Sequence, residues 1–198
     1  VHEVRAVRDG GVFHPKVWIV RYVADGEPAQ YRLLCASRNL TFDRSWDTLL
    51  VLDGVAGKKA AKKNEPLSRF ISSLQEIAVQ ELPDNTKNTL AELAYGIGHV
   101  DFELPDHIED IDFWPLGLHG AQDVWPFPDR ADRGLIIAPF VTESTLGQLN
   151  ISSEQTLVSR VDVLGSLDPS QMDCYEIFAL SEGADFEQEE GAEPDDGV

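Results

Sequence analysis

Four side chains near the start of the chain have the chemistry that phosphate binding needs: His14, Lys16, Ser37 and Asn39. An imidazole acts as a nucleophile or as a general acid, and an ammonium group attracts anions. Hydroxyl and amide groups donate hydrogen bonds to phosphoryl oxygens. This combination is typical of sites that bind anions or transfer phosphoryl groups.

Two predicted β-strands would bring these residues together. The apolar pattern predicts strands over residues 12–23 and 31–37, and the pair Asp25-Gly26 between them suits a tight turn. Side chains two apart in a strand share a face, so His14 and Lys16 are expected to point the same way. The same holds for the serine and the asparagine that follow the second strand. The proline between the histidine and the lysine has no N–H group, so its strand is expected to lie at an edge or an irregularity.

The order of these residues resembles one half of the phospholipase D superfamily. The family repeat carries His-x-Lys, then a small residue with Ser-x-Asn, then an acidic residue. In this chain the corresponding residues are His14-Pro15-Lys16, Ala36-Ser37-Arg38-Asn39-Leu40-Thr41 and Asp47. Many members have Asp five residues after the Lys, where this chain has Arg21. In this departure it is similar to the variant half-site of tyrosyl-DNA phosphodiesterases and of many bacterial nuclease-like relatives.

The resemblance implies an active site built from two half-sites, with no metal or other cofactor. One histidine would attack phosphorus to form a covalent phosphohistidine, and the other would protonate the leaving oxygen. His14 would take one of these two roles, which the sequence does not distinguish. Lys16 and Asn39 would bind the phosphate, with Ser37 assisting. The alternative interpretation is a surface hairpin whose histidine and lysine are only solvated.

An acidic residue is expected to orient a histidine by accepting its ring N–H. Asp47 matches the family position best, and Asp43 is the second choice. For Asp47, a structural role as an acid in a turn is the alternative.

The chain is strongly acidic, but its charge is unevenly distributed. The net charge is −19 over 198 residues, which on its own argues against a polyanionic partner. Residues 182–196 contain eight acids and no base, whereas residues 1–63 contain eleven Lys and Arg against seven Asp and Glu. The part with the motif therefore has a net charge of +4, which is compatible with binding a nucleic acid.

Two amphipathic helices are predicted after a basic segment at residues 54–63. Asn64 is expected to cap the first helix, and Pro66 suits its first turn. Apolar residues then recur at helical spacing up to residue 78, and a second helix is predicted over residues 86–97. Both helices are expected to cover one face of a sheet.

Two further strands are predicted in this part of the chain, over residues 2–8 and, as a buried strand, over residues 48–52. Cys35 and Cys174 are expected to be buried in strands. Two cysteines without paired spacing favour a reducing compartment.

The last part of the chain alternates strand and helix. Strands are predicted over residues 134–138, 156–160 and 174–180, the first of them buried. Thr142 or Ser144 is expected to cap the helix after the first strand. This alternation predicts parallel pairing with crossover helices.

The predicted fold is α/β, a mixed β-sheet flanked by helices, similar to phospholipase D and spanning parts of two repeats. Residues 1–63 would be the later part of one repeat, residues 64–132 helices and a connector, residues 133–181 the early part of the next repeat, and residues 182–198 a disordered acidic tail. Residues 1–7 match residues 174–180 in their apolar pattern. The chain is therefore expected to be a slice of a longer protein, with a second His-x-Lys soon after Val198.

The preferred hypothesis is a phosphodiesterase, a bacterial cytoplasmic nuclease acting on nucleic acid or on another phosphodiester. The second half-site would come from the rest of the protein or from a homodimer partner, and the chain without it is expected to be weak or inactive. No apolar run predicts a membrane partner. The alternative is a noncatalytic binding or assembly module that keeps the phospholipase D-like fold.

Overall fold

The structure, a computed structural model, describes residues 1–8, 10–39, 48–119 and 124–180. The chain divides into two compact units, Val1–Trp125 and Pro126–Val198, and each is described here by itself. None of the helices in these described ranges has the length and apolar character that a membrane crossing needs.

The first unit is built on an antiparallel sheet in the order β1-β2-β3-β4. Its strands are β1 (Val17–Tyr22), β2 (Gln30–Ala36), β3 (Leu49–Ala56) and β4 (Val100–Phe102). The predicted hairpin is confirmed, with Val17 opposite Cys35 and Tyr22 opposite Gln30. The first strand is shorter than predicted, because it begins after Pro15, and β1 lies at an edge of the described sheet.

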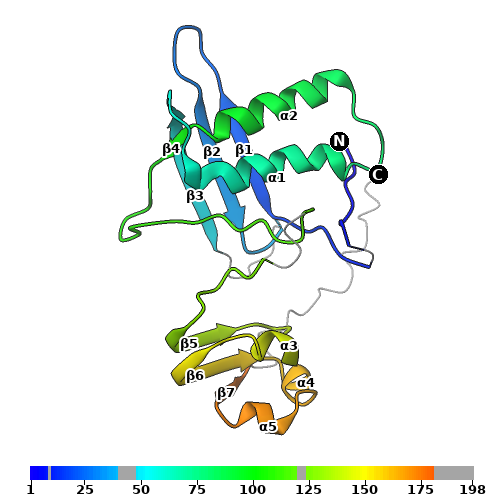
Figure 1. Cartoon of the computed structure of the whole chain (residues 1–198), viewed down its shortest axis with the longest axis vertical. Coiled ribbons are helices and arrows are strands. Elements are labelled where there is room, and N and C mark those ends of the chain that lie inside the picture. Colours follow the sequence, from blue (N-terminus) through cyan, green and yellow to red (C-terminus); the bar gives the residue numbers. More distant parts are fainter. Residues whose placement is uncertain (9, 40–47, 120–123, 181–198) are drawn as a thin grey trace, which may run out of the picture. The chain divides into compact units, whose positions relative to one another are not determined.

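Two helices cover one face of this sheet (Figure 1). A short 3-10 helix, η1 (Lys62–Asn64), leads into α1 (Glu65–Glu76), and α2 (Asp84–Ile97) follows. The buried core between them and the sheet consists of Tyr31, Leu33, Leu52, Leu67, Ile71, Ala94, Ile97 and Val100. Both predicted helices and their place over one face are therefore confirmed.

The third strand was predicted as fully buried, and this is wrong. Leu52 is completely buried, but Leu49 and Val51 are exposed. Side chains alternate along β3, so only every second residue faces the helices, while the opposite face of the described sheet stays open. A short apolar run therefore indicated a strand but not its burial on both sides.

Asn64 has a different role from the predicted one. Its side chain makes no capping hydrogen bond to α1. Instead it is buried, and its amide nitrogen donates to the carbonyl oxygens of Ile97 (2.9 Å) and Val100 (2.8 Å). Asn64 thus ties the start of α1 to the end of α2 and to β4.

The predicted strand at residues 2–8 is not formed. This segment makes one isolated antiparallel bridge, between Val4 and Ala78, supported by the Arg5 amide, which donates to the carbonyl of Ile77 at 2.9 Å. The matching residues 174–180 instead include β7 (Glu176–Ala179) of a parallel sheet. The two segments that match in sequence therefore have different structures.

The second unit has a parallel sheet in the order β5-β6-β7, as predicted. Its elements are β5 (Ala131–Ile137), α3 (Glu143–Leu146), β6 (Ile151–Ser159), α4 (Val161–Leu164), α5 (Pro169–Met172) and β7. The backbone N–H of Thr145 donates to the Thr142 side chain, which caps α3. Leu146, Leu157, Leu167 and Met172 form the core.

Two further burial predictions, for β5 and for the cysteines, are wrong. In β5, Leu135 is 66% and Ile137 is 64% exposed, because the core of this unit includes Ile136 on the opposite face. Cys35 and Cys174 are free and exposed rather than buried, and Cys174 precedes β7. The fold class is thus mixed α/β, with one antiparallel and one parallel sheet flanked by helices.

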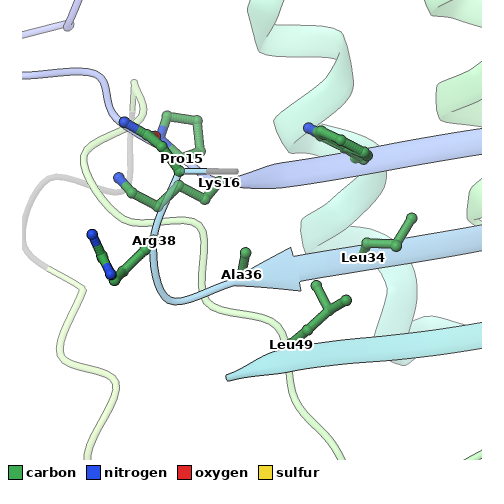
Figure 2. A pocket seen from close by; sticks show the side chains of 8 residues that line it. Pro15, Lys16, Leu34, Ala36, Arg38 and Leu49 are labelled. Carbon is green, nitrogen blue, oxygen red and sulfur yellow. The ribbon is translucent and has the colours of Figure 1, made fainter. Parts of the chain in front are cut away.

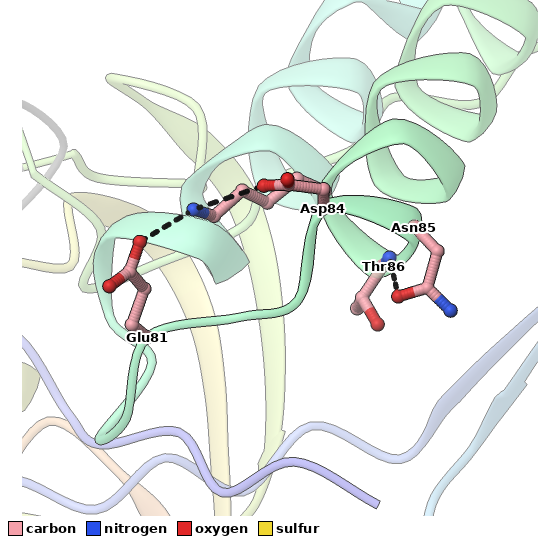
Figure 3. Close-up of polar contacts among 5 residues, drawn as sticks. Glu81, Asp84, Asn85 and Thr86 are labelled. Atoms are coloured by element: carbon pink, nitrogen blue, oxygen red, sulfur yellow. Dashed lines mark hydrogen bonds and ion pairs between the residues drawn. The ribbon is translucent and has the colours of Figure 1, made fainter.

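We predict that Asn64→Ala lowers the free energy of unfolding of the chain by about 2 kcal/mol, because two buried carbonyl oxygens lose a donor. Urea denaturation followed by circular dichroism measures this. The control is Asn85→Ala, since the Asn85 oxygen accepts only a local hydrogen bond from the exposed Thr86 backbone N–H (Figure 3). That change is expected to stay within about 0.5 kcal/mol. Equal stability of the two variants would contradict the role given to Asn64.

Candidate functional site

The paired ends of β1 and β2 bring the two parts of the motif together. The backbone N–H of Ala36 donates to the carbonyl oxygen of Lys16 at 2.8 Å, which continues the hairpin ladder one residue beyond β1. The backbone N–H of Ser37 then donates to the carbonyl oxygen of Thr48 at 3.0 Å. Lys16 and the Ser-x-Asn segment therefore lie at the same end of the sheet.

A hollow of about 130 Å³ lies at this end. We call it the Lys16 hollow. Its lining consists of Pro15, Lys16, Trp18, Leu34, Ala36, Arg38, Asn39 and Leu49. Figure 2 shows the side chains of Lys16 and Arg38 at the ends of the strands, beside a row of apolar residues on β2 and β3. Among the described lining residues there are two cations and no acid, so the local charge favours an anion.

His14 lines a different hollow, of about 500 Å³, on the side of the sheet that faces the helices. Phe13, Phe70 and Trp114 line it too, and the rings of Phe13 and Phe70 are stacked with centroids 6.3 Å apart. His14 and Lys16 were expected to share a face, and the structure separates their side chains. The reason is that β1 begins only at Val17, so the two-residue alternation does not extend back to the histidine.

The backbone still holds the histidine close to the lysine. The Lys16 ammonium donates to the carbonyl oxygen of His14 at 3.3 Å. His14 is exposed, and Lys16 is half-buried. Pro15, which lies between the two residues in sequence, lines both hollows. The His14 and Lys16 side chains therefore line neighbouring but different hollows.

Ser37 has a structural contact in addition to its expected role. Its hydroxyl oxygen accepts a hydrogen bond from the backbone N–H of Thr48 at 3.0 Å. With the backbone bond between the same two residues, this contact closes the connection from β2 to β3 at its base. A serine hydroxyl can accept one hydrogen bond and donate another, so accepting from Thr48 does not by itself exclude assistance to a phosphate.

The acids that were expected to orient a histidine, Asp47 and Asp43, lie outside the described residues. Within the described part of the chain, Asp112 lines the same hollow as His14. Asp112 ends an acid-rich stretch of the sequence, residues 99–112, and no local spacing links it to the histidine. Its proximity arises from the chain after β4, where Ile111 and Phe113 pack against the core and bring the acid with them.

Arg21, the departure from the family pattern, points to the helices. Its guanidinium lies 2.9 Å from the Glu92 carboxylate of α2 and also hydrogen-bonds the Tyr31 hydroxyl. Burial raises the pKa of the Tyr31 phenol, and the positive charge of Arg21 partly opposes that rise. Gly96 leaves room for this phenol, because a Cβ there would overlap its hydroxyl. Arg21 therefore connects the hairpin to α2 and lies on the face opposite to Lys16.

Several other cations of this unit are neutralised by acids. Arg32 makes two hydrogen bonds to the Asp53 carboxylate, at 2.6 and 2.8 Å, and this pairing lowers the pKa of Asp53. Lys63 pairs with Asp110, and Lys87 lies 2.9 Å from Glu81 and 3.9 Å from Asp84 (Figure 3). By contrast, the Lys16 ammonium donates to a neutral acceptor, the carbonyl oxygen of His14. Among the described residues, no acid pairs with the Lys16 ammonium, so its positive charge is available to an anion in the hollow.

Two residues of the Lys16 hollow were not identified from the sequence. Arg38 was treated as the variable residue between Ser37 and Asn39, and Trp18 was treated as a strand residue. The two-residue period of β1 was a usable signal for Trp18, since it shares a face with Lys16. No comparable signal existed for Arg38, because it follows the strand.

No protein-family model matches this chain, and no curated protein or solved structure shows significant similarity to it. The phospholipase D interpretation therefore depends on the motif residues and on the geometry described above.

We predict that Arg21→Ala lowers the free energy of unfolding by about 1 to 2 kcal/mol, because the buried Tyr31 hydroxyl loses a donor and the Glu92 pair is removed. A double-mutant cycle with Glu92→Ala should give a coupling of about 0.5 kcal/mol. The matched control is Arg69→Ala, since Arg69 forms only an exposed pair with Glu65 at 4.0 Å. If Arg21→Ala is no more destabilising than Arg69→Ala, the connecting role is wrong.

Proposed function

We propose that the first unit is a phospholipase D-like half-site that binds and cleaves a phosphodiester, with nucleic acid as its substrate. The observation that carries this proposal is that Lys16 and Asn39, two residues of the motif, line one hollow together with Arg38. These residues come from both strands of the hairpin and present two positive charges and an amide. A phosphodiester has the complementary charge and acceptor oxygens.

In the proposed reaction, the imidazole of His14 attacks phosphorus with the lone pair of a ring nitrogen. The P–N bond forms, the P–O bond to the leaving group breaks, and the leaving oxygen takes a proton from a general acid. Water then attacks the phosphohistidine, the P–N bond breaks, and the water proton passes to a base. If His14 is instead the general acid, the second half-site supplies the nucleophile.

Lys16, Arg38 and Asn39 hold the nonbridging oxygens, where negative charge increases in the transition state. The ammonium of Lys16 donates to the His14 carbonyl oxygen, so a phosphate bound to this ammonium would lie close to the backbone of His14. Since His14 is exposed, rotation of its side chain can turn the ring from its own hollow toward that phosphate. Asp112 lines the same hollow as His14, which makes it a candidate to accept a ring N–H of this histidine.

The complete reaction needs a second half-site. A second copy of this chain, arranged about a twofold axis, would supply another His14 and another Lys16. Further sequence of the same protein is the other source. In both arrangements, the two histidines must approach the same phosphorus from opposite sides.

A second candidate is a noncatalytic module that binds phosphodiesters without cleaving them. The observation that favours it is the separation of His14 and Lys16 into different hollows. Arg21 also favours the noncatalytic module. Many phospholipase D family members have an acid at this position near the site, whereas Arg21 pairs with Glu92. Both candidates share the Lys16 hollow and differ only in the role of His14.

We predict that paired copies of the chain hydrolyse bis(p-nitrophenyl) phosphate, because pairing supplies both half-sites, and that His14→Asn abolishes this activity. His107→Asn is the matched control, because His107 is also exposed, and its left-handed backbone (φ 69°) tolerates Asn. Denaturing electrophoresis after incubation with a radiolabelled phosphodiester should reveal an acid-labile, base-stable adduct in the wild type only. Equal hydrolysis by wild type and His14→Asn would exclude His14 from catalysis.

Lys16→Ala tests the phosphate site that both candidates share. It is expected to weaken phosphodiester binding about tenfold, the effect of losing one charge-assisted hydrogen bond, while Lys58→Ala is expected to change it little. Loss of binding in Lys16→Ala without any adduct or hydrolysis in the wild type would favour the noncatalytic module. Unchanged binding would reject both candidates.

A further inference from the structure

The Lys16 hollow has an aromatic wall next to its cations. Trp18 lies two residues after Lys16 on the same face of β1, about 7 Å farther along the strand. It is 54% exposed, although it lines the hollow with both cations. An indole held in a strand and open to solvent on one side provides a flat surface for stacking.

The surroundings of Trp18 are apolar and fixed by the sheet. Its partner across the strands is Leu34, which in turn lies opposite Val51, and Ala36 lies opposite Leu49. Leu34, Ala36 and Leu49 also line the hollow and give the indole a rigid neighbourhood. Along this face, the cations Lys16 and Arg38 lie at the strand end, and the exposed ring of Trp18 follows among apolar side chains.

We propose that Trp18 stacks on a base of a single-stranded nucleic acid whose phosphate is held by Lys16 and Arg38. A nucleotide has a phosphate and a flat base within one repeat of its backbone, which matches this order of charge and aromatic surface. A base inside a duplex is stacked on both faces and paired along one edge, so it is not free to stack on a side chain. The inference rests on the proposed phosphodiester site and adds to it a substrate class, single strands, and a positioning residue, Trp18.

The local charge supports a single-stranded nucleic acid as the ligand of the open sheet face. The described lining of the hollow has no acid, and residues 1–63 have a net charge of +4 in a chain of −19. Arg32 on the same face is neutralised by Asp53, so the cationic part of the face is limited to the strand end that holds Lys16. A phosphate is thus directed to that end, and the adjoining base reaches Trp18.

The test measures binding of a fluorescein-labelled twelve-residue oligothymidylate by anisotropy at several salt concentrations. Trp18→Ala is expected to weaken binding about tenfold, and Trp18→Phe less than about threefold, because the phenyl ring still stacks. An oligomer of the same length made of abasic nucleotides should bind wild type and Trp18→Ala equally. The control is Trp114→Ala, since Trp114 is 51% exposed but lines the His14 hollow instead.

Salt dependence distinguishes this inference from the proposed function on which it rests. Lys16→Ala should weaken binding of the thymidylate and of the abasic oligomer alike. It should also reduce by about 1 the slope of the logarithm of the binding constant against the logarithm of the salt concentration, whereas Trp18→Ala should leave this slope unchanged. If Lys16→Ala has this effect and Trp18→Ala has none, the stacking inference is overturned and the phosphodiester site stands. If neither variant changes binding, both fail.

Three other outcomes overturn the stacking inference. The first is that Trp18→Ala weakens binding of the abasic oligomer as much as binding of the oligothymidylate. The second is that a duplex binds as tightly as the single strand and depends on Trp18 in the same way. The third is a Trp18-dependent association of the chain with itself, or with phosphatidylglycerol vesicles, without any effect on oligothymidylate. Circular dichroism and urea denaturation of each variant check that the fold is intact.

Discussion

The apolar contact between the two helices and one face of the β1–β4 sheet determines where every side chain of the candidate site can point. Leu33 and Leu52 from the sheet pack with Leu67, Ile71 and Ile97 from the helices, and nearly no solvent reaches them. Because side chains alternate along a strand, burying this face commits the intervening residues to the other face. Lys16 and Trp18 lie on that open face, and Arg21 lies on the covered one.

This constraint explains why Arg21 has a structural partner. On the covered face it meets α2, where Glu92 and the Tyr31 hydroxyl satisfy its guanidinium. An acid at this position would face Glu92 with the same charge, and like charges in close contact are destabilising. The departure from the family pattern thus belongs to the packing of this unit and does not remove a group from the Lys16 hollow.

The charge of the chain illustrates the difference between total and local electrostatics. A net charge of −19 would repel a polyanion, but at about 0.15 M salt the field of distant charges is screened within about 8 Å. The hollow is lined by Lys16 and Arg38, and Asp53 of the same sheet is paired with Arg32. Local composition and pairing therefore decide which ligand the hollow suits, and the total charge does not.

The sequence by itself determined the hairpin, the two amphipathic helices and the parallel pairing of β5 to β7, because each depends on local periodicity and turn chemistry. It also predicted that Lys16 and Asn39 lie close together, since each is next to one of two strands that pair. Local patterns do not say which face of a strand is covered, so the burial of β3 and β5 was predicted wrongly.

Only the tertiary structure decided that His14 lies on the other side of Pro15 from the lysine hollow, that Asn64 joins two helices, and that Trp18 and Arg38 belong to the site. Each of these depends on which segments pack together across long separations in the chain, and no local period encodes that.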